Sequence, residues 1–200
     1  MLGVLAWLAV SADVEPWIEA NQTDDGITVW YRDVHGKRIR EVKATGVVDA
    51  AVDLVWFVLR DVEHFVEFMP YVTEARVLSE AGPNARYVYQ HLDPPIVDER
   101  DYTLKITSEK LSDGSYFQYW SPANDKGPPR TDGVVRLEIC EGNWTAEPLN
   151  PTQTRITYWL YTDPGGSIPS WVANMANTRS LPDLVRSVRN RSIDPTWKRD

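Results

Sequence analysis

Between Val72 and Thr162 the sequence alternates apolar and polar residues in six separate runs, and this feature constrains the fold most. Alternation with a period of two is typical of strands with one buried face. Clusters of glycine, proline, asparagine and aspartate separate the runs, as at turns. The predicted strands are residues 72–79, 86–92, 100–107, 116–120, 134–144 and 154–162. Consecutive strands with short connections favour one contiguous antiparallel sheet.

The segment after the last run adds a second constraint. It begins with a double-glycine turn, Asp163-Pro-Gly-Gly166, and Pro169 then suits the first turn of a helix, where its missing N–H costs nothing. The apolar residues that follow mostly recur at helical spacing, which predicts a long C-terminal helix with one apolar face. These residues are Trp171, Val172, Met175, Leu181, Leu184, Val185 and Val188. Pro182 is expected to kink or break this helix near Leu181. The apolar face needs a partner, which is either a solid core or the mouth of a cavity.

The N-terminal part of the chain supplies the remaining elements. We predict a short helix at residues 16–21, strands at 26–32 and 38–48, and helices at 51–60 and 64–68. Asp49 is the expected N-cap of the first of the last two helices. Two strands, two short helices, six strands and one long helix segregate helices from sheet, so the fold class is α+β. The length of 200 residues suits a single domain, over residues 13–200.

Composition and charge exclude several classes of function. The net charge is −8, which argues against a nucleic-acid partner. Residues 176–200 hold six Arg or Lys and three Asp, a local charge of +3 that leaves −11 for the rest; this is either a solvated helix face or a surface for anionic headgroups. The single cysteine, Cys140, permits no internal disulfide, and no metal-binding spacing occurs. We therefore expect no metal and no cofactor.

The first twelve residues contain no charged side chain and are mostly apolar. They are either the remnant of a signal peptide or an N-terminal helix, and they are too short to span a membrane. Val10-Ser-Ala12 has the small residues of a cleavage site, although the usual positive start is missing. We favour export, which predicts a periplasmic or secreted protein; the alternative is a cytoplasmic one.

Five motifs in this order resemble the START (StAR-related) lipid-transfer domain, especially small single-domain bacterial members. The motifs are Asp25-Gly-Ile-Thr-Val29, Glu41-Val-Lys-Ala-Thr-Gly46, Asp61-Val-Glu63 with Met69-Pro70, Arg100-Asp101-Tyr102, and Asp163-Pro-Gly-Gly166 with Ile168-Pro169. The resemblance covers residues 17–191 and implies a helix-grip fold. In that fold a curved antiparallel sheet wraps around a long C-terminal helix, with two short helices after the second strand. A tunnel between sheet and helix holds one lipid, and the helix and nearby loops act as a lid.

The aromatic residues are consistent with such a tunnel, because rings with polar tips are common in concave apolar sites. Nine Trp and nine Tyr are many for this length, and each ring either lines a cavity or packs elsewhere. The candidate ligand-binding residues of the sheet are Tyr87, Tyr89, His91, Arg100, Tyr102, Leu104, Ile106, Tyr119 and Trp144. Those of the lid are Trp171, Val172 and Met175.

Arg100 allows two interpretations. By alternation it shares a largely apolar face with Tyr102, Leu104 and Ile106. A buried guanidinium must be paired, so Arg100 either ties strand ends together through an acid such as Asp98 or Glu99, or binds a lipid headgroup. Some sterol-binding members of the family carry a further basic residue at the position of Ile106, and its absence here weakens any transfer of sterol specificity.

Three functions remain open. The leading hypothesis is a monomeric, non-enzymatic protein that binds a lipid and transfers it at a transient membrane contact, with Arg186 and Arg189 near anionic headgroups. The second is an aromatase/cyclase-like enzyme, for which His91, Tyr102 and Arg100 are the only acid–base candidates, unless His91 is a satisfied polar residue. The third is an accessory module that presents a quinone or a partner protein.

Overall fold

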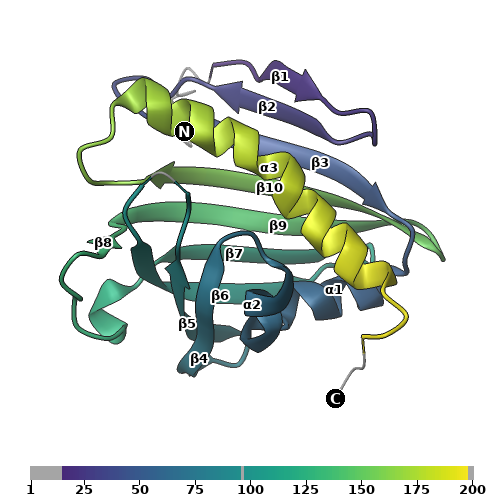
Figure 1. The fold of residues 1–200 in the computed structure, drawn as a ribbon. Helices are drawn as coiled ribbons and strands as arrows, with labels where there is room; N and C mark the ends of the chain where they lie inside the picture. The colour runs from purple at the N-terminus through teal and green to yellow at the C-terminus, as the bar shows by residue number, and fades with distance from the viewer. Residues whose placement is uncertain (1–14, 96, 198–200) are drawn as a thin grey trace, which may run out of the picture.

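The computed structural model describes residues 15–95 and 97–197, which form a ten-stranded sheet crossed by one long helix (Figure 1). The strands are β1 (Ile18–Gln22), β2 (Thr28–Arg32), β3 (Glu41–Val48), β4 (Val72–Gly82), β5 (Ala85–Leu92), β6 (Arg100–Lys110), β7 (Tyr116–Pro122), β8 (Val135–Arg136), β9 (Ile139–Asn150) and β10 (Gln153–Asp163). The helices are α1 (Val52–Arg60), η1 (Val62–His64), α2 (Phe65–Phe68), η2 (Asn124–Lys126) and α3 (Ser170–Ile193). The α+β class and the helix-grip fold are therefore confirmed.

The sheet runs in the order β1-β2-β3-β10-β9-β7-β6-β5-β4, so the third strand of the chain, β3, lies beside the last one, β10. These neighbours pair antiparallel, and the two-residue strand β8 pairs parallel with β6. The sheet curves around α3, which lies diagonally over the concave side, while α1 and α2 close the end near the C-terminus of α3 (Figure 1). This arrangement places one continuous concave surface opposite the helix.

Glycine at position 46 sets how closely α3 approaches the sheet. A Cβ atom at Gly46 would lie 2.8 Å from Cγ1 of Val185 and 3.0 Å from a guanidinium nitrogen of Arg189. Val185 and Val188 are fully buried on this side of the helix. Asp25, in the turn between β1 and β2, then holds Arg186 and Arg189 through ion pairs of 2.9 and 3.0 Å. Close packing on β3 and these pairs fix the C-terminal half of α3.

Several expectations about local structure were wrong. Residues 16–21 are not a helix, because residues 18–22 pair with β2 as an edge strand, and pairing with a distant segment outweighs local preference. Asp49 does not cap α1, since the cap is Ala51 and the Asp49 carboxylate accepts a hydrogen bond from Gln153 instead. The two short helices follow the third strand rather than the second because β1 was not foreseen.

The helix α3 continues through Pro182 without a break. Proline removes one backbone hydrogen bond inside a helix, but burial of residues on both sides of it offsets that loss. The predicted strand 134–144 is divided into β8 and β9. Arg136 turns toward Asp101 of β6 in a buried ion pair, which draws β8 away from the line of β9.

Candidate functional site

The concave face of the sheet is the candidate site because it faces α3 across the interior (Figure 1). Strand register decides which side chains lie on it, since residues directly opposite each other on paired strands point to the same face. Tyr102 lies opposite Gln90, and Tyr158 lies opposite both Trp144 and Ala44. The concave-face side chains include Val88, Gln90, Tyr102, Leu104, Ile106, Trp120, Cys140, Trp144, Tyr158 and Leu160.

Five of the residues predicted from the sequence share this face. Arg100, Tyr102, Leu104 and Ile106 alternate along β6, and Trp144 lies on β9. Trp144 is buried and its ring centroid is 4.6 Å from that of Tyr158. Apolar side chains and rings thus form the wall, and Tyr102 brings a hydroxyl group into it.

Four other predicted residues lie on the opposite, convex face: Tyr87, Tyr89, His91 and Tyr119. His91 lies opposite Asp101, which alternates with Arg100 and Tyr102 and therefore points away from the interior. Placing the two sets on one wall was wrong because β5 pairs with β6 in a register that puts Val88 and Gln90, rather than the two tyrosines, against the concave side. Tyr119 is 42% exposed.

The three lid candidates come from the first turns of α3. Val172 is half-buried, and Met175 is 38% exposed and lines a groove on the flank of α3 that faces β1 and β2. The side chain of Trp171 lies outside the described residues, so its expected role as a lid residue stays a prediction. The residues of α3 that are buried toward the sheet in this half are Ala173 and Leu181.

Two tyrosines place polar groups deep in the apolar wall. Desolvation raises the pKa of both Tyr102 and Tyr158 above the ordinary tyrosine value, yet both side chains keep accessible surface. Both rings therefore lie deep in the wall without being fully covered by packed neighbours. The Tyr102 hydroxyl donates to Oε1 of Gln90 at 2.7 Å. No hydrogen bond joins the Tyr158 hydroxyl to any side chain or backbone group that the structure describes.

Trp120 and Cys140 complete the wall beside Tyr158. A Cβ atom at Gly142 would lie 2.3 Å from the Trp120 indole, so glycine there lets the ring lie flat across β9. The Trp120 and Tyr158 ring centroids are 5.6 Å apart. Burial raises the pKa of the Cys140 thiol to about 12, so the thiol remains protonated and unreactive at neutral pH.

The sequence-based set of site residues omitted Gln90, Trp120, Tyr158 and Leu160. One signal was available for Tyr158, because it alternates with the fully apolar Ile156 along the last strand. No comparable signal existed for Gln90, a polar residue between Tyr89 and His91. Its place on the wall follows only from the register with β6.

Arg100 is buried at the start of β6, and its guanidinium bonds to backbone carbonyls. Nε donates to the carbonyl of Pro164 at 3.3 Å, and Nη1 donates to the carbonyl of Asp98. The expectation of a carboxylate partner was wrong, since Glu99 instead pairs with Nε2 of His91 at 2.8 Å. Burial lowers the pKa of Arg100, and the side chain joins the β5–β6 loop to the loop that leads into α3.

On the convex face a buried ion pair holds the long loop between β7 and β9. Arg136 and Asp101 form two hydrogen bonds of 2.6 and 2.7 Å, with side chains 4% and 2% exposed. The Tyr89 hydroxyl adds a hydrogen bond of 3.2 Å to Asp101, and desolvation by the same environment raises the pKa of Tyr89 to about 12. Tyr89 therefore belongs to a structural cluster and not to the concave wall.

A family model described as polyketide cyclase / dehydrase and lipid transport matches residues 48–189. The chain therefore belongs to this family, and its fold is that of a START-like domain. A search of solved structures found a STAR-related lipid transfer protein from Xanthomonas axonopodis, 31% identical with a TM-score of 0.80; the match covers 89% of this chain and 99% of that one. An aromatase/cyclase from Streptomyces, 19% identical with a TM-score of 0.55 over 76% of this chain and 93% of that one, shares the fold alone.

Among curated sequences, an uncharacterised protein of Pseudomonas aeruginosa is 30% identical over 168 residues, which cover 84% of this chain and 82% of that protein. Rat phosphatidylcholine transfer protein is 26% identical over 90% of this chain and 85% of its own length. The chain spans 60% of the length of mouse START domain-containing protein 10. Within the part of the chain that the structure describes, no helix is long and apolar enough to cross a membrane.

Proposed function

We propose that the protein binds one lipid-like ligand between the concave face and α3 and carries it between membranes. The observation that carries this proposal is the apolar concave wall opposite α3, in which Tyr102 and Tyr158 lie deep and yet keep accessible surface. Membership of a family described by lipid transport supports the same conclusion. Burial of the ligand's chains stabilises the complex by about 25 cal/mol per Å² of apolar surface.

We assign the polar contact with the ligand to Tyr158. Its hydroxyl is desolvated and lacks a hydrogen-bond partner among the described residues, whereas Tyr102 already donates to Gln90. The Tyr158 hydroxyl keeps its donor and acceptor capacity free, so a ligand with a hydroxyl, carbonyl or ester oxygen at this point gains a hydrogen bond in a site of low polarity. Sterols, phospholipids, fatty acids and quinones are all compatible with this wall.

Opening of the site requires the loops joined by Arg100 to separate. The backbone after Pro164 passes through Gly165 and Gly166, both with positive φ near +65°, before α3 begins. Breaking the hydrogen bond from Arg100 to the Pro164 carbonyl frees this turn from the β5–β6 loop. We propose this movement as the step that admits and releases the ligand at a membrane surface.

The enzymatic alternative loses its main candidate. The interior holds Tyr102 and Arg100 from the predicted acid–base set, but His91 lies on the convex face beside Glu99. A protonated cysteine and two tyrosines with raised pKa values do not form a proton-transfer pair at neutral pH. We therefore propose a carrier without catalytic activity.

Contacts within the protein, rather than a free surface for anionic headgroups, occupy the guanidinium groups of Arg186 and Arg189. Both guanidinium groups bind Asp25, and Arg189 also donates to the carbonyl of Val47 at 3.0 Å. These contacts fasten α3 to the sheet, so reversing either charge would disturb folding before it disturbed docking.

A vesicle exchange assay with two matched variants tests the proposal. Leu160→Trp adds volume inside the concave wall, whereas Tyr119→Trp changes a side chain on the convex face that is 42% exposed. We expect transfer of a fluorescent phospholipid, sterol or fatty acid by the wild type and by Tyr119→Trp, and strongly reduced transfer by Leu160→Trp at unchanged thermal stability. Equal transfer by all three proteins for every lipid that is transported would contradict the assignment of the site.

Export and the monomeric state remain predictions. Residues 1–12 lie outside the described residues, so the signal-peptide interpretation rests on sequence alone. N-terminal sequencing of the protein from its native host tests it, and an intact Met1 would contradict cleavage. Sedimentation of the purified protein tests the monomer.

A further inference from the structure

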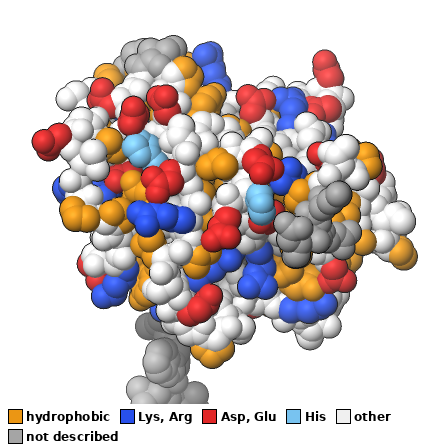
Figure 2. Space-filling model, turned by 60° about the horizontal axis from the view of Figure 1, so that its bottom comes forward, with side chains coloured by type: hydrophobic (Ala, Val, Ile, Leu, Met, Phe, Trp, Pro, Cys, Tyr) orange, Lys and Arg blue, Asp and Glu red, His pale blue; other side chains and the backbone are white. Residues whose placement is uncertain are grey.

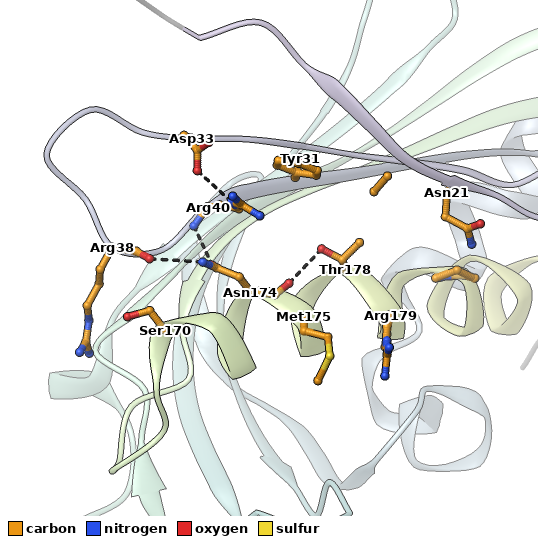
Figure 3. Close-up of a pocket in the computed structure, with 12 residues that line it drawn as sticks. Asn21, Tyr31, Asp33, Arg38, Arg40, Ser170, Asn174, Met175, Thr178 and Arg179 are labelled. Atoms are coloured by element: carbon orange, nitrogen blue, oxygen red, sulfur yellow. Dashed lines mark hydrogen bonds and ion pairs between the residues drawn. The ribbon is translucent and has the colours of Figure 1, made fainter.

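A groove of about 800 Å³ lies between the β1–β2 hairpin, the loop after β2 and the N-terminal half of α3 (Figure 3). One wall carries Asn21, Tyr31 and Arg40, and the other carries Asn174, Thr178 and Arg179. It is lined by the flank of α3 that turns toward β1 and β2, whereas Asn177 and Ala173 turn toward β10 and the interior. The groove is thus a second site, distinct from the concave wall, and its volume suits a small ligand group.

Three arginines and one carboxylate, that of Asp33, line this groove, so its lining is basic in a protein whose net charge is −8. Arg179 is exposed and forms no ion pair within residues 15–95 and 97–197. Arg40 lies 4.3 Å over the Tyr31 ring and binds Asp33 at 2.8 Å, while Arg38, 63% exposed, binds Asp163 at 2.9 Å. Arg38 and Arg40 keep exposed N–H donors after these pairs form, and Arg179 keeps all of its N–H donors.

The groove is held in shape by one asparagine side chain. Oδ1 of Asn174 accepts the backbone N–H of Arg40 at 3.0 Å, and Nδ2 donates to the carbonyl of Arg38 at 3.3 Å. Thr178 donates to the carbonyl of Asn174 one turn further along α3. The backbone bearing two of the arginines is therefore fixed against the helix bearing the third, which reduces the ordering cost of binding an anion.

We propose that this groove binds the phosphate of an anionic phospholipid headgroup and thereby docks the protein on a membrane. Arginine guanidinium groups match phosphate oxygens in charge and geometry, and the excess of three arginines over one aspartate in the lining suits an anionic headgroup better than a neutral one. The inference rests on the proposed function for its use at a membrane, but it concerns a different surface.

The position of the groove favours a membrane-attached phosphate. Arg38 binds Asp163, the last residue of β10, whose neighbour Pro164 is held by Arg100 at the predicted opening of the interior. A headgroup that takes Arg38 from Asp163 would loosen the same loop that must move to admit a lipid. On the lower face of the molecule, turned forward in Figure 2, acidic and basic side chains are interspersed.

Flotation with vesicles of phosphatidylcholine, with and without phosphatidylglycerol, tests the assignment at low and physiological salt. The variants are Arg179→Ala and the double variant Arg40→Ala/Arg179→Ala. The control is Arg155→Ala, which removes another exposed arginine at the other end of β10, 3.4 Å from Glu147. We expect binding to the anionic vesicles to weaken about fivefold for each groove arginine replaced, and not at all in the control.

Equal binding by the wild type and both groove variants would overturn the proposal. Displacement from vesicles by inorganic phosphate at the same ionic strength would support recognition of the phosphate, whereas binding of inorganic phosphate without any binding to the anionic vesicles would assign the groove to a soluble phosphate and overturn docking. Native mass spectrometry of the same samples separates this test from the proposed function: an interior lipid retained in Arg179→Ala while flotation weakens supports both, whereas absence of lipid from the wild type contradicts only the proposed function. Unchanged thermal unfolding of Arg179→Ala confirms that its fold is intact.

Discussion

Replacement of Arg136 by leucine should be among the most damaging single changes in the protein. The change leaves the carboxylate of Asp101, 2% exposed, without the two hydrogen bonds of 2.6 and 2.7 Å that now satisfy it. Loss of one partner of a buried ion pair costs about 3–5 kcal/mol, because the remaining charge stays desolvated. A domain of this size has a total stability of roughly 5–15 kcal/mol, so the loss is a large part of it.

The double variant Asp101→Leu/Arg136→Leu should recover much of this loss, because both charges are then removed from the interior. Urea unfolding followed by tryptophan fluorescence measures the three free energies, with Asp101→Leu as the other single variant. We expect a coupling energy of several kcal/mol and a fall in the melting temperature on the order of 10 °C for Arg136→Leu. A cost below about 1 kcal/mol for that variant would refute the reasoning, as would additive effects of the two changes. Because the pair lies on the convex face, lipid bound by the folded fraction should be unchanged.

Three further predictions concern packing, pH and the ligand contact. Gly46→Ala should cost about 1–3 kcal/mol by urea unfolding, because its Cβ would press on the fully buried Val185, while Val47→Ala on the exposed side of β3 should cost little. Asp25→Asn should make the loss of stability at acid pH smaller, by less than about 1 kcal/mol. Hydrogen bonding holds the pKa of Asp25 below its usual 3.8, so the contribution of Asp25 to stability is present above that pH and is lost as the pH falls. An equal loss of stability at acid pH in the variant and the wild type would contradict this. Tyr158→Phe should leave stability within about 1 kcal/mol of the wild type but weaken ligand retention, and unchanged retention would remove Tyr158 as the polar contact.

The period-two pattern of the strands was enough to predict the sheet and its fold class. Polar and apolar positions alternate from residue 101 to residue 107, and the four residues Arg100, Tyr102, Leu104 and Ile106 do share one face. Short-range pattern decides such questions where only one face of the sheet is buried, because successive side chains then alternate between the core and the solvent. The edge strand β1 was missed because all five of its side chains are exposed, so its sequence has no burial pattern to detect.

The relative placement of strands was beyond the sequence. Tyr87, Tyr89 and His91 share a face with one another, as expected, but which face depends on the register between β5 and β6. A shift by one residue would have brought His91 into the interior beside Tyr102, and with it the acid–base chemistry of the enzymatic hypothesis. Likewise, the sequence gives no sign that Arg186 and Arg189 are paired, because Asp25, which binds both in the structure, lies more than a hundred residues away.

Native mass spectrometry of the gently purified protein, followed by organic extraction and lipid identification, tests the central claim most directly. The concave wall, with its desolvated tyrosines, predicts one lipid bound per chain, and loss of that lipid in Leu160→Trp but not in Tyr119→Trp. A protein that carries no lipid, even after incubation with vesicles of the host's total lipid extract, would contradict the claim that its interior is a lipid-binding site.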